Sequence, residues 1–578
     1  MAAPRFLSYV VHRRMSPLRH TLLVAGLAVV CLLAGAPARA LDTQLPNMGS
    51  SAGAIASPEE QRQYGFYVLH EMRNQSMVLD DALLTDYLNT LGYRLVAYSP
   101  MPNQAFTFFV VRDNGINAFA LPGGFVGVNA GLITTTTTES ELAAVLAHEI
   151  SHVTQQHLVR AVEAEQKYAP LMVLAMVGAI VAASHQGAGS TSNADVGAIA
   201  TAQGLMQQMQ INFTRADESE ADRIGIQTLA RANFDPDAMA GFFERMQHAL
   251  RPGFDENDVP AMLMDHPVTL QRISEAKARA VAAKKEELQR SAVVTATPTP
   301  TPLLTLPPGA AMNSSAVTAA LARPSESSEQ QRARAENYYE LMRERTRVLA
   351  SERPTQTLAY YQRNASDGMA DKYGEVLALE RAGETAKARE AAIKLASAHP
   401  GQLVLQLVLG HTELMSGARD AAIKRYAELE AEYPGNRALM LAHAEALLHG
   451  GDKASAKVAQ ELLRPQITDA EEDPDLYTVF GRACELAGDP VRAGESHAAA
   501  AYLNGRAEDA LNQLKDLSKR RELDYYQRAR IDARIAEMTP IVLELRRRKI
   551  KPSDQGKLAL DPKPVSACRT DTCAALSF

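Results

Sequence analysis

The chain has 578 residues, more than one hydrophobic core accommodates, so two or more domains are expected. Hydrophobic residues make up 46% and charged residues 22% of it, an ordinary balance for a folded soluble protein. The formal net charge is -7 and no basic stripe is present, so the charge pattern offers no footprint for nucleic acid.

The N-terminal residues have the composition of a secretory signal. Arginine occurs four times between positions 5 and 19, ahead of an apolar run from Thr21 to Gly35. Ala38-Arg39-Ala40 then places small side chains two residues apart, as at a cleavage site, so we expect residues 1–40 to be removed on export. An uncleaved anchor is the alternative, although the run is shorter than the roughly 20 residues that span a bilayer.

Two helices are predicted at the start of the mature chain. Ser57-Pro58-Glu59-Glu60 combines a capping box with proline at the first helical position, and a helix should run from there to about Asn74. A second helix is expected over Asp81 to Tyr98.

Three segments rich in β-forming residues follow. They are Ala105–Arg112, Ala118–Leu121 and Phe125–Asn129, with a turn at Pro122–Gly124 between the last two. This pattern predicts a short antiparallel sheet. Combined with the helices around it, the sheet places this part of the chain in the α+β class.

The next helix carries the motif with the clearest chemistry. Thr138 and Glu141 form a second capping box, and the helix they open is expected to run through Val153 to Ala164. His148-Glu149-Ile150-Ser151-His152 lies within it, and residues four apart share one face of a helix, so the two imidazoles can bind one metal ion. Glu149 is placed to take a proton from water that zinc activates.

A nearly continuous apolar segment, Pro170–Ala183, comes next. At 14 residues it is shorter than a membrane span. Periodicity does not separate a buried core helix from a hairpin near the site that touches a membrane surface, so both interpretations stay open.

Two histidines leave a catalytic zinc ion short of one protein ligand. Glu218 and Asp222 are again four residues apart on a predicted helix, so one carboxylate can bind the metal while the other accepts from a histidine ring. An acidic, solvent-facing helix is the alternative for this stretch alone. Glu220 points elsewhere and is expected to be solvated.

A Pro/Thr/Ser/Ala-rich stretch from Thr295 to Ser328 predicts a linker and a domain boundary. Beyond it Gly383, Gly417 and Gly451 are 34 residues apart, each between an apolar helix and an Ala-rich helix. This is the tetratricopeptide period, and such solenoids offer a concave surface to protein partners. An Ala-rich helical bundle is the alternative.

Export would place the chain in an oxidising compartment, with three cysteines left after cleavage. Cys568 and Cys573 can close a small disulfide loop in the tail. Cys484 lies in an apolar helical segment and is expected to be a buried, inert thiol.

Taken together, three stretches resemble peptidase family M48. They are His148–His152, the Glu218 and Asp222 pair, and Asn117–Gly124, and the resemblance covers roughly Ser57 to Lys277. It implies one zinc ion per chain, held by His148, His152 and Glu218, with Glu149 as the general base.

The resemblance also implies roles for residues around the metal. Asp222 matches an acidic residue of the family that acts in catalysis, as a proton donor or as the group that orients a histidine. His266, in Asp265-His266-Pro267, matches a histidine that can become a fourth ligand and gate the site. The strand with Asn117, Phe119 and Leu121 would be an edge to which a substrate backbone adds.

The expected architecture is an α+β zincin-like metalloprotease domain followed by an all-α tetratricopeptide-repeat solenoid. Its expected parts are a signal peptide (1–40), the peptidase domain (41–285), a linker (286–330), the repeats (331–550) and a tail (551–578). With export and repeats added, the resemblance implies a periplasmic endopeptidase for misassembled outer-membrane proteins that contacts their assembly machinery. The alternative is a chaperone or adaptor whose metal site is silent or gated.

Overall fold

The computed structural model describes residues 57–163, 214–248, 262–263, 266–294, 328–364, 366–469 and 473–547. The predictions for the signal peptide, for Pro170–Ala183, for the stretch 295–327 and for the pairing of Cys568 with Cys573 lie outside these residues. Within the described part of the chain, no helix combines the length and apolar character needed to cross a membrane.

The first two predicted helices are confirmed. Helix α2 spans Pro58–Asn74, and Ser57 and Glu60 form the reciprocal capping box before it. Helix α3 spans Ala82–Val96 and begins where the Asp81 side chain accepts from a backbone N–H of the first turn. Local capping chemistry therefore sets where both helices start.

The three predicted strands are present as β1 (Thr107–Val111), β2 (Ala118–Leu121) and β3 (Phe125–Asn129). The prediction of an antiparallel sheet is wrong for one of the two pairs, because the strand order is β1-β3-β2 and β1 runs parallel to β3. The β2–β3 hairpin is antiparallel, with Gly123 and Gly124 at φ 81° and 89° in its turn. The loop after β1 carries the chain past β3 before the hairpin returns it to the middle of the sheet.

Helix α4 (Ala130–Thr135) leads into α5 (Glu139–Thr154), which packs against α3, β2 and α8 (Asp237–His248). The predicted continuation of α5 to Ala164 is wrong. Gln156 adopts φ 55°, a left-handed conformation that ends the helix, and a separate helical segment covers residues 157–163.

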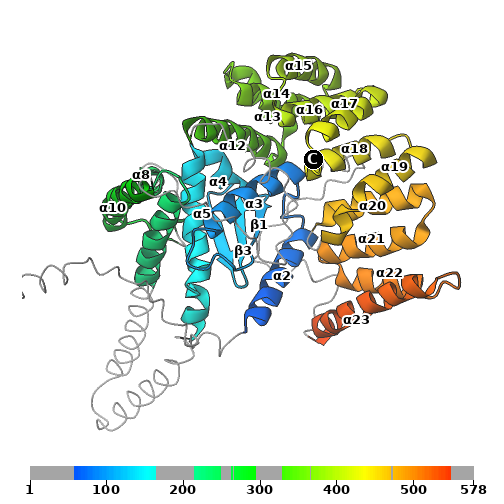
Figure 1. Cartoon of the computed structure of the whole chain (residues 1–578), viewed down its shortest axis with the longest axis horizontal. Helices are drawn as coiled ribbons and strands as arrows, with labels where there is room; N and C mark the ends of the chain where they lie inside the picture. The colour runs from blue at the N-terminus through cyan, green and yellow to red at the C-terminus, as the bar shows by residue number, and fades with distance from the viewer. Residues whose placement is uncertain are drawn as a thin grey trace, which may run out of the picture. The chain divides into compact units, whose positions relative to one another are not determined.

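A further helix covers residues 214–231, and α10 (Leu270–Val294) packs on α8. Together these elements form an α+β unit around the small sheet (Figure 1). Its core includes Leu88, Val126 and Leu146, all fully buried.

From residue 328 the described chain is helical. The helices are α12 (Ser328–Ala350), α13 (Pro354–Asn364), α14 (Met369–Arg381), α15 (Thr385–Ala398), α16 (Leu403–Met415), α17 (Arg419–Glu432), α18 (Arg437–Leu448), α19 (Lys453–Leu463), α20 (Pro474–Ala487), α21 (Pro490–Leu503), α22 (Ala507–Ser518) and α23 (Tyr525–Arg547), with a short 3-10 helix at Gln466–Asp469. Each helix from α14 to α23 contacts the next one in the chain (Figure 1).

The predicted helix–turn–helix spacing is confirmed. Gly383, Gly417 and Gly451 have φ of 80°, 85° and 67° and lie in the turns between α14 and α15, α16 and α17, and α18 and α19. Left-handed backbone of this kind favours glycine, which explains the regular spacing. Cys484 in α20 is fully buried, as expected, and burial raises the pKa of its thiol to about 12.

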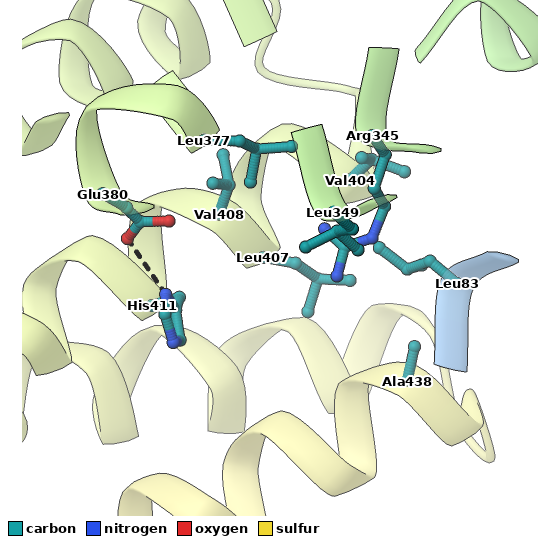
Figure 2. A pocket seen from close by; sticks show the side chains of 10 residues that line it. All are labelled: Leu83, Arg345, Leu349, Leu377, Glu380, Val404, Leu407, Val408, His411 and Ala438. Carbon is teal, nitrogen blue, oxygen red and sulfur yellow. Dashed lines mark hydrogen bonds and ion pairs between the residues drawn. The ribbon is translucent and has the colours of Figure 1, made fainter. Parts of the chain in front are cut away.

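Helix α12 joins the helical region to the α+β unit. It packs against α3, α4 and α5, and Tyr339 donates a hydrogen bond of 2.6 Å to the carbonyl oxygen of Thr136. Figure 2 shows a pocket where α3 and α12 face α14, α16 and α18, lined mostly by leucine and valine. At its polar edge Glu380 lies 2.9 Å from His411.

Candidate metal centre

The two motif histidines lie on a helix that is held rigidly in the core. Leu142, Leu146 and Ile150 are at most 1% exposed and fix the apolar side of α5. His148 and His152 project together one turn apart, so their Nε2 atoms are 3.0 Å apart. The helical spacing in the sequence therefore does bring both imidazoles to one point.

The helix over residues 214–231 brings Glu218 to the same point. Its Oε2 atom lies 3.4 Å from His148 Nε2, and its Oε1 atom lies 3.4 Å from His152 Nε2. The close approach of the two helices depends on Gly225, because a Cβ there would stand 3.3 Å from backbone atoms of Ala147 and His148.

His266 reaches the cluster from the segment before α10. Its Nδ1 atom lies 2.8 Å from Glu218 Oε1 and 3.4 Å from His148 Nε2. One potential ligand atom from each of His148, His152, Glu218 and His266 lies within 4.8 Å of all the others.

Glu149 borders this cluster without belonging to it. Its side chain is almost fully buried, at 1% exposure, and its Oε1 atom lies 3.7 Å from His266 Nε2. This position beside the cluster is compatible with the general base that the sequence predicts.

Asp222 lies behind His148 and away from the point where the ligand atoms meet. Its Oδ1 atom is 3.0 Å from His148 Nδ1, and the carboxylate is fully buried. This geometry favours the orienting role over proton donation, because Asp222 contacts the far nitrogen of the ring.

The neighbouring charges and burial shift the pKa values of His148, His152 and Glu218 in different directions. Burial alone would lower the pKa of His148, but Asp222 and Glu218 outweigh it and raise that pKa to about 10. Burial and the charge of His148 hold the pKa of His152 well below its usual value. Burial alone would raise the pKa of Glu218, but His148 and His266 hold it well below its usual range.

Sequence reasoning missed Arg272, on α10. Its guanidinium donates two hydrogen bonds of 2.8 Å to Asp222, and Nη1 lies 2.8 Å from Glu218 Oε2 and donates to Pro267 O at 3.0 Å. It joins both carboxylates to the segment that carries His266. No local pattern marks Arg272, since its two carboxylate partners lie on the helix over residues 214–231, about 50 residues earlier in the chain.

Sequence reasoning also missed His157, and it was wrong about Glu220. His157 Nδ1 lies 2.8 Å from His152 Nδ1. Glu220 is not merely solvated, because its Oε2 atom lies 3.2 Å from His157 Nε2 and 3.1 Å from Arg160. The expectation of an unbroken helix to Ala164 hid this contact, since it placed His157 on another face of α5.

The predicted substrate strand is β2. It pairs only with β3 in the described sheet, so it is an edge strand, and it packs against α5. Phe119 and Leu121 are half-buried, and the backbone carbonyl of Asn117 accepts from Asn129 N at 3.0 Å.

Imidazole nitrogens and a carboxylate are the donor set that zinc prefers, and four such groups converge here. Their ligand atoms lie 2.8–3.4 Å from one another, close enough to share one cation. Two histidines four apart on one helix, a glutamate between them and a carboxylate from a second helix define a metallopeptidase.

Comparison with known proteins agrees with this class. Residues 82–280 match the sequence profile of Peptidase family M48. The chain is 31% identical over 530 residues to the beta-barrel assembly-enhancing protease of Yersinia pestis, an alignment that covers 89% of this chain and 97% of that protein. The chain therefore belongs to peptidase family M48 and is a metalloendopeptidase.

Two further relatives show how far the similarity extends. The beta-barrel assembly-enhancing protease of Escherichia coli K12 is 30% identical over 86% of this chain and 91% of that protein. The mitochondrial metalloendopeptidase OMA1 of Schizosaccharomyces pombe is 34% identical, but over only 28% of this chain and 44% of that protein. The alignments with the two beta-barrel assembly-enhancing proteases therefore include the helical region.

Replacing Arg272 by methionine is expected to weaken zinc binding by about 10- to 100-fold, because Glu218 and Asp222 lose the cation that holds their positions. Arg272→Lys should recover only part of this, since an ammonium group does not reproduce the two parallel hydrogen bonds. Competition of the full chain with a chelator measures the zinc Kd. An unchanged Kd for Arg272→Met would remove Arg272 from the metal centre.

Proposed function

We propose that the chain is a zinc endopeptidase of the periplasm that degrades misassembled outer-membrane proteins and assists their assembly through its helical repeats. The observation that carries the proposal is the convergence of His148, His152, Glu218 and His266 within 4.8 Å, beside Glu149. The names of the relatives that align with nearly the whole chain support the link to β-barrel assembly.

In this proposal His148, His152 and Glu218 hold one zinc ion, and Asp222 orients His148 through Nδ1. Zinc supplies Lewis acidity that polarises a peptide carbonyl and acidifies water. Glu149 accepts the proton of the attacking water and passes it to the leaving amine. The substrate backbone extends the sheet along β2, at Asn117, Phe119 and Leu121.

We assign His266 the role of a gate. Its Nδ1 atom occupies a place among the ligand atoms, 2.8 Å from Glu218 Oε1, where it would compete with water for the metal. The segment that carries it must move away for cleavage, and Arg272 links that segment to the two carboxylates through Pro267.

The remaining parts of the chain follow the expected order: a signal peptide (1–40), the peptidase domain (41–285), a linker (286–330), tetratricopeptide repeats (331–550) and a tail (551–578). The repeats would bind the envelope assembly machinery. Because α12, α3 and α2 already pack against α14, α18 and α21 respectively, the partner surface belongs to the faces that these contacts leave uncovered. Association with the outer membrane would follow from that partner, or from a peripheral contact of the exported chain.

One observation favours a second function. If His266 stays bound at the metal, the site is closed and the chain acts as a chaperone or adaptor through its repeats. The 2.8 Å contact between His266 and Glu218 supports this alternative.

The proposal predicts that cleavage depends on one zinc ion per chain. Stripping the full-length mature chain with dipicolinate should reduce cleavage of denatured casein to background, and one equivalent of zinc should restore it. Zinc content by atomic absorption and casein cleavage are measured on the same sample. Cleavage that survives complete removal of the metal would contradict the proposed mechanism.

A further inference from the structure

The two metal-facing histidines have different partners on their second ring nitrogen. His148 directs Nδ1 to a carboxylate, Asp222, at 3.0 Å. His152 directs Nδ1 to another imidazole, because His157 Nδ1 lies 2.8 Å away. His157 is only 4% exposed, and the turn at Gln156, with φ 55°, places it against the end of α5.

The far side of His157 is anchored by charge. Its Nε2 atom lies 3.2 Å from Glu220 Oε2 and 3.7 Å from Asp217 Oδ1. Arg160 contacts both carboxylates, at 3.1 Å to Glu220 and 3.3 Å to Asp217, and offsets part of their charge. His157 is therefore held from both sides, with its ring fixed between a metal-facing histidine and a glutamate.

The arrangement admits one consistent placement of protons. A histidine that binds metal through Nε2 must carry its proton on Nδ1. His152 Nδ1–H then donates to His157 Nδ1, which must accept. His157 in turn carries its proton on Nε2 and donates it to the carboxylate of Glu220. Each hydrogen bond in the chain has one donor and one acceptor.

We propose that His157 is a positioning residue of the metal centre, which fixes the ring orientation and tautomer of His152 and is itself anchored by Glu220 and Arg160. The inference rests on the proposed zinc site. It assigns His152 a neutral acceptor where His148 has a carboxylate, so the two ligands differ in how strongly their nitrogens are polarised.

A second metal ion is the competing explanation, because potential ligand atoms of His157, Asp217 and Glu220 lie within 4.8 Å of one another. Two contacts favour the positioning role instead. The Arg160 guanidinium already contacts both carboxylates, so a metal ion there would have to compete with it for their oxygens. One ring nitrogen of His157 is also committed to His152.

The test compares two substitutions of His157 in the full chain. His157→Leu removes the acceptor and should raise the zinc Kd by about 10- to 100-fold and shift the visible absorption of the Co2+-substituted protein. His157→Asn should restore most of the affinity and the wild-type spectrum, since its amide oxygen can accept near the place of Nδ1. His70→Leu is the matched control, because His70 is also buried but packs on Phe66 and Tyr502, outside the site.

Each outcome has a defined meaning. Wild-type affinity for His157→Leu, or equal weakening by Leu and Asn, would overturn the positioning role. Two zinc ions in the wild type and one in His157→Leu would overturn it in favour of a second metal. Failure of the wild type to bind zinc would instead overturn the proposed function. If His157→Leu does not fold, Glu220→Leu replaces it, because leucine removes the acceptor for His157 Nε2–H, and a zinc Kd unchanged by that variant would overturn the inference.

Discussion

Replacing Glu149 by glutamine should lower kcat/KM for peptide cleavage by about 100- to 10,000-fold, with zinc content unchanged. The carboxylate lies beside the ligand cluster but contributes no atom to it, so glutamine removes the proton acceptor and spares the metal. An amide of the same shape keeps the buried contacts of the side chain. Cleavage of denatured casein and zinc content are measured on the full-length mature chain.

Glu139→Gln provides the matched control, because it makes the same change at the other end of α5. Burial raises the pKa of Glu139 to about 7, so an uncharged amide is a mild change there, and cleavage should match the wild type. Equal cleavage by Glu149→Gln and wild type would exclude Glu149 as the base. Full rescue of an envelope-assembly defect by an inactive Glu149→Gln would favour the adaptor alternative.

Replacing Arg345 by methionine should lower the free energy of unfolding by about 3 to 5 kcal/mol, the cost of leaving a buried charge unpaired. Arg345 on α12 donates two hydrogen bonds, of 2.8 Å and 2.6 Å, to Asp81 at the start of α3, and a third to Tyr373. Both charged side chains are at most 4% exposed. Urea denaturation followed by far-UV circular dichroism measures the change.

Two further variants separate the buried charge from other effects. Arg464→Met breaks a surface pair with Glu461, where both side chains are more than half exposed, and should cost less than about 1 kcal/mol. Asp81→Asn combined with Arg345→Met should recover much of the lost stability, since no uncompensated charge remains. A loss for Arg345→Met no larger than that for Arg464→Met would contradict the role of this ion pair.

Features set by neighbouring residues could be predicted from the sequence. Ser57 and Thr138 cap α2 and α5 as expected, and the glycine spacing marks turns between helices. The pairing of β1 could not be predicted, because the local signals for a strand do not say which neighbour it joins. That choice depends on how the loop after β1 crosses the sheet.

In the candidate site, too, some features could be predicted from the sequence and others depend on tertiary packing. His148 and His152 share a helix face through spacing alone, so their meeting could be predicted. Glu218 was a reasonable candidate, but its approach depends on Gly225 packing against the backbone of α5.

By itself, the sequence determined the helix caps, the metal-facing pair on α5 and the helix–turn–helix period, because each arises from interactions over a few residues. Only the tertiary structure decided the strand order and brought Glu218, His266 and Arg272 to that pair. It also placed His157 behind His152, through a left-handed residue that ends α5 early. Contacts between distant segments depend on how whole elements pack, and no local pattern of residues encodes that.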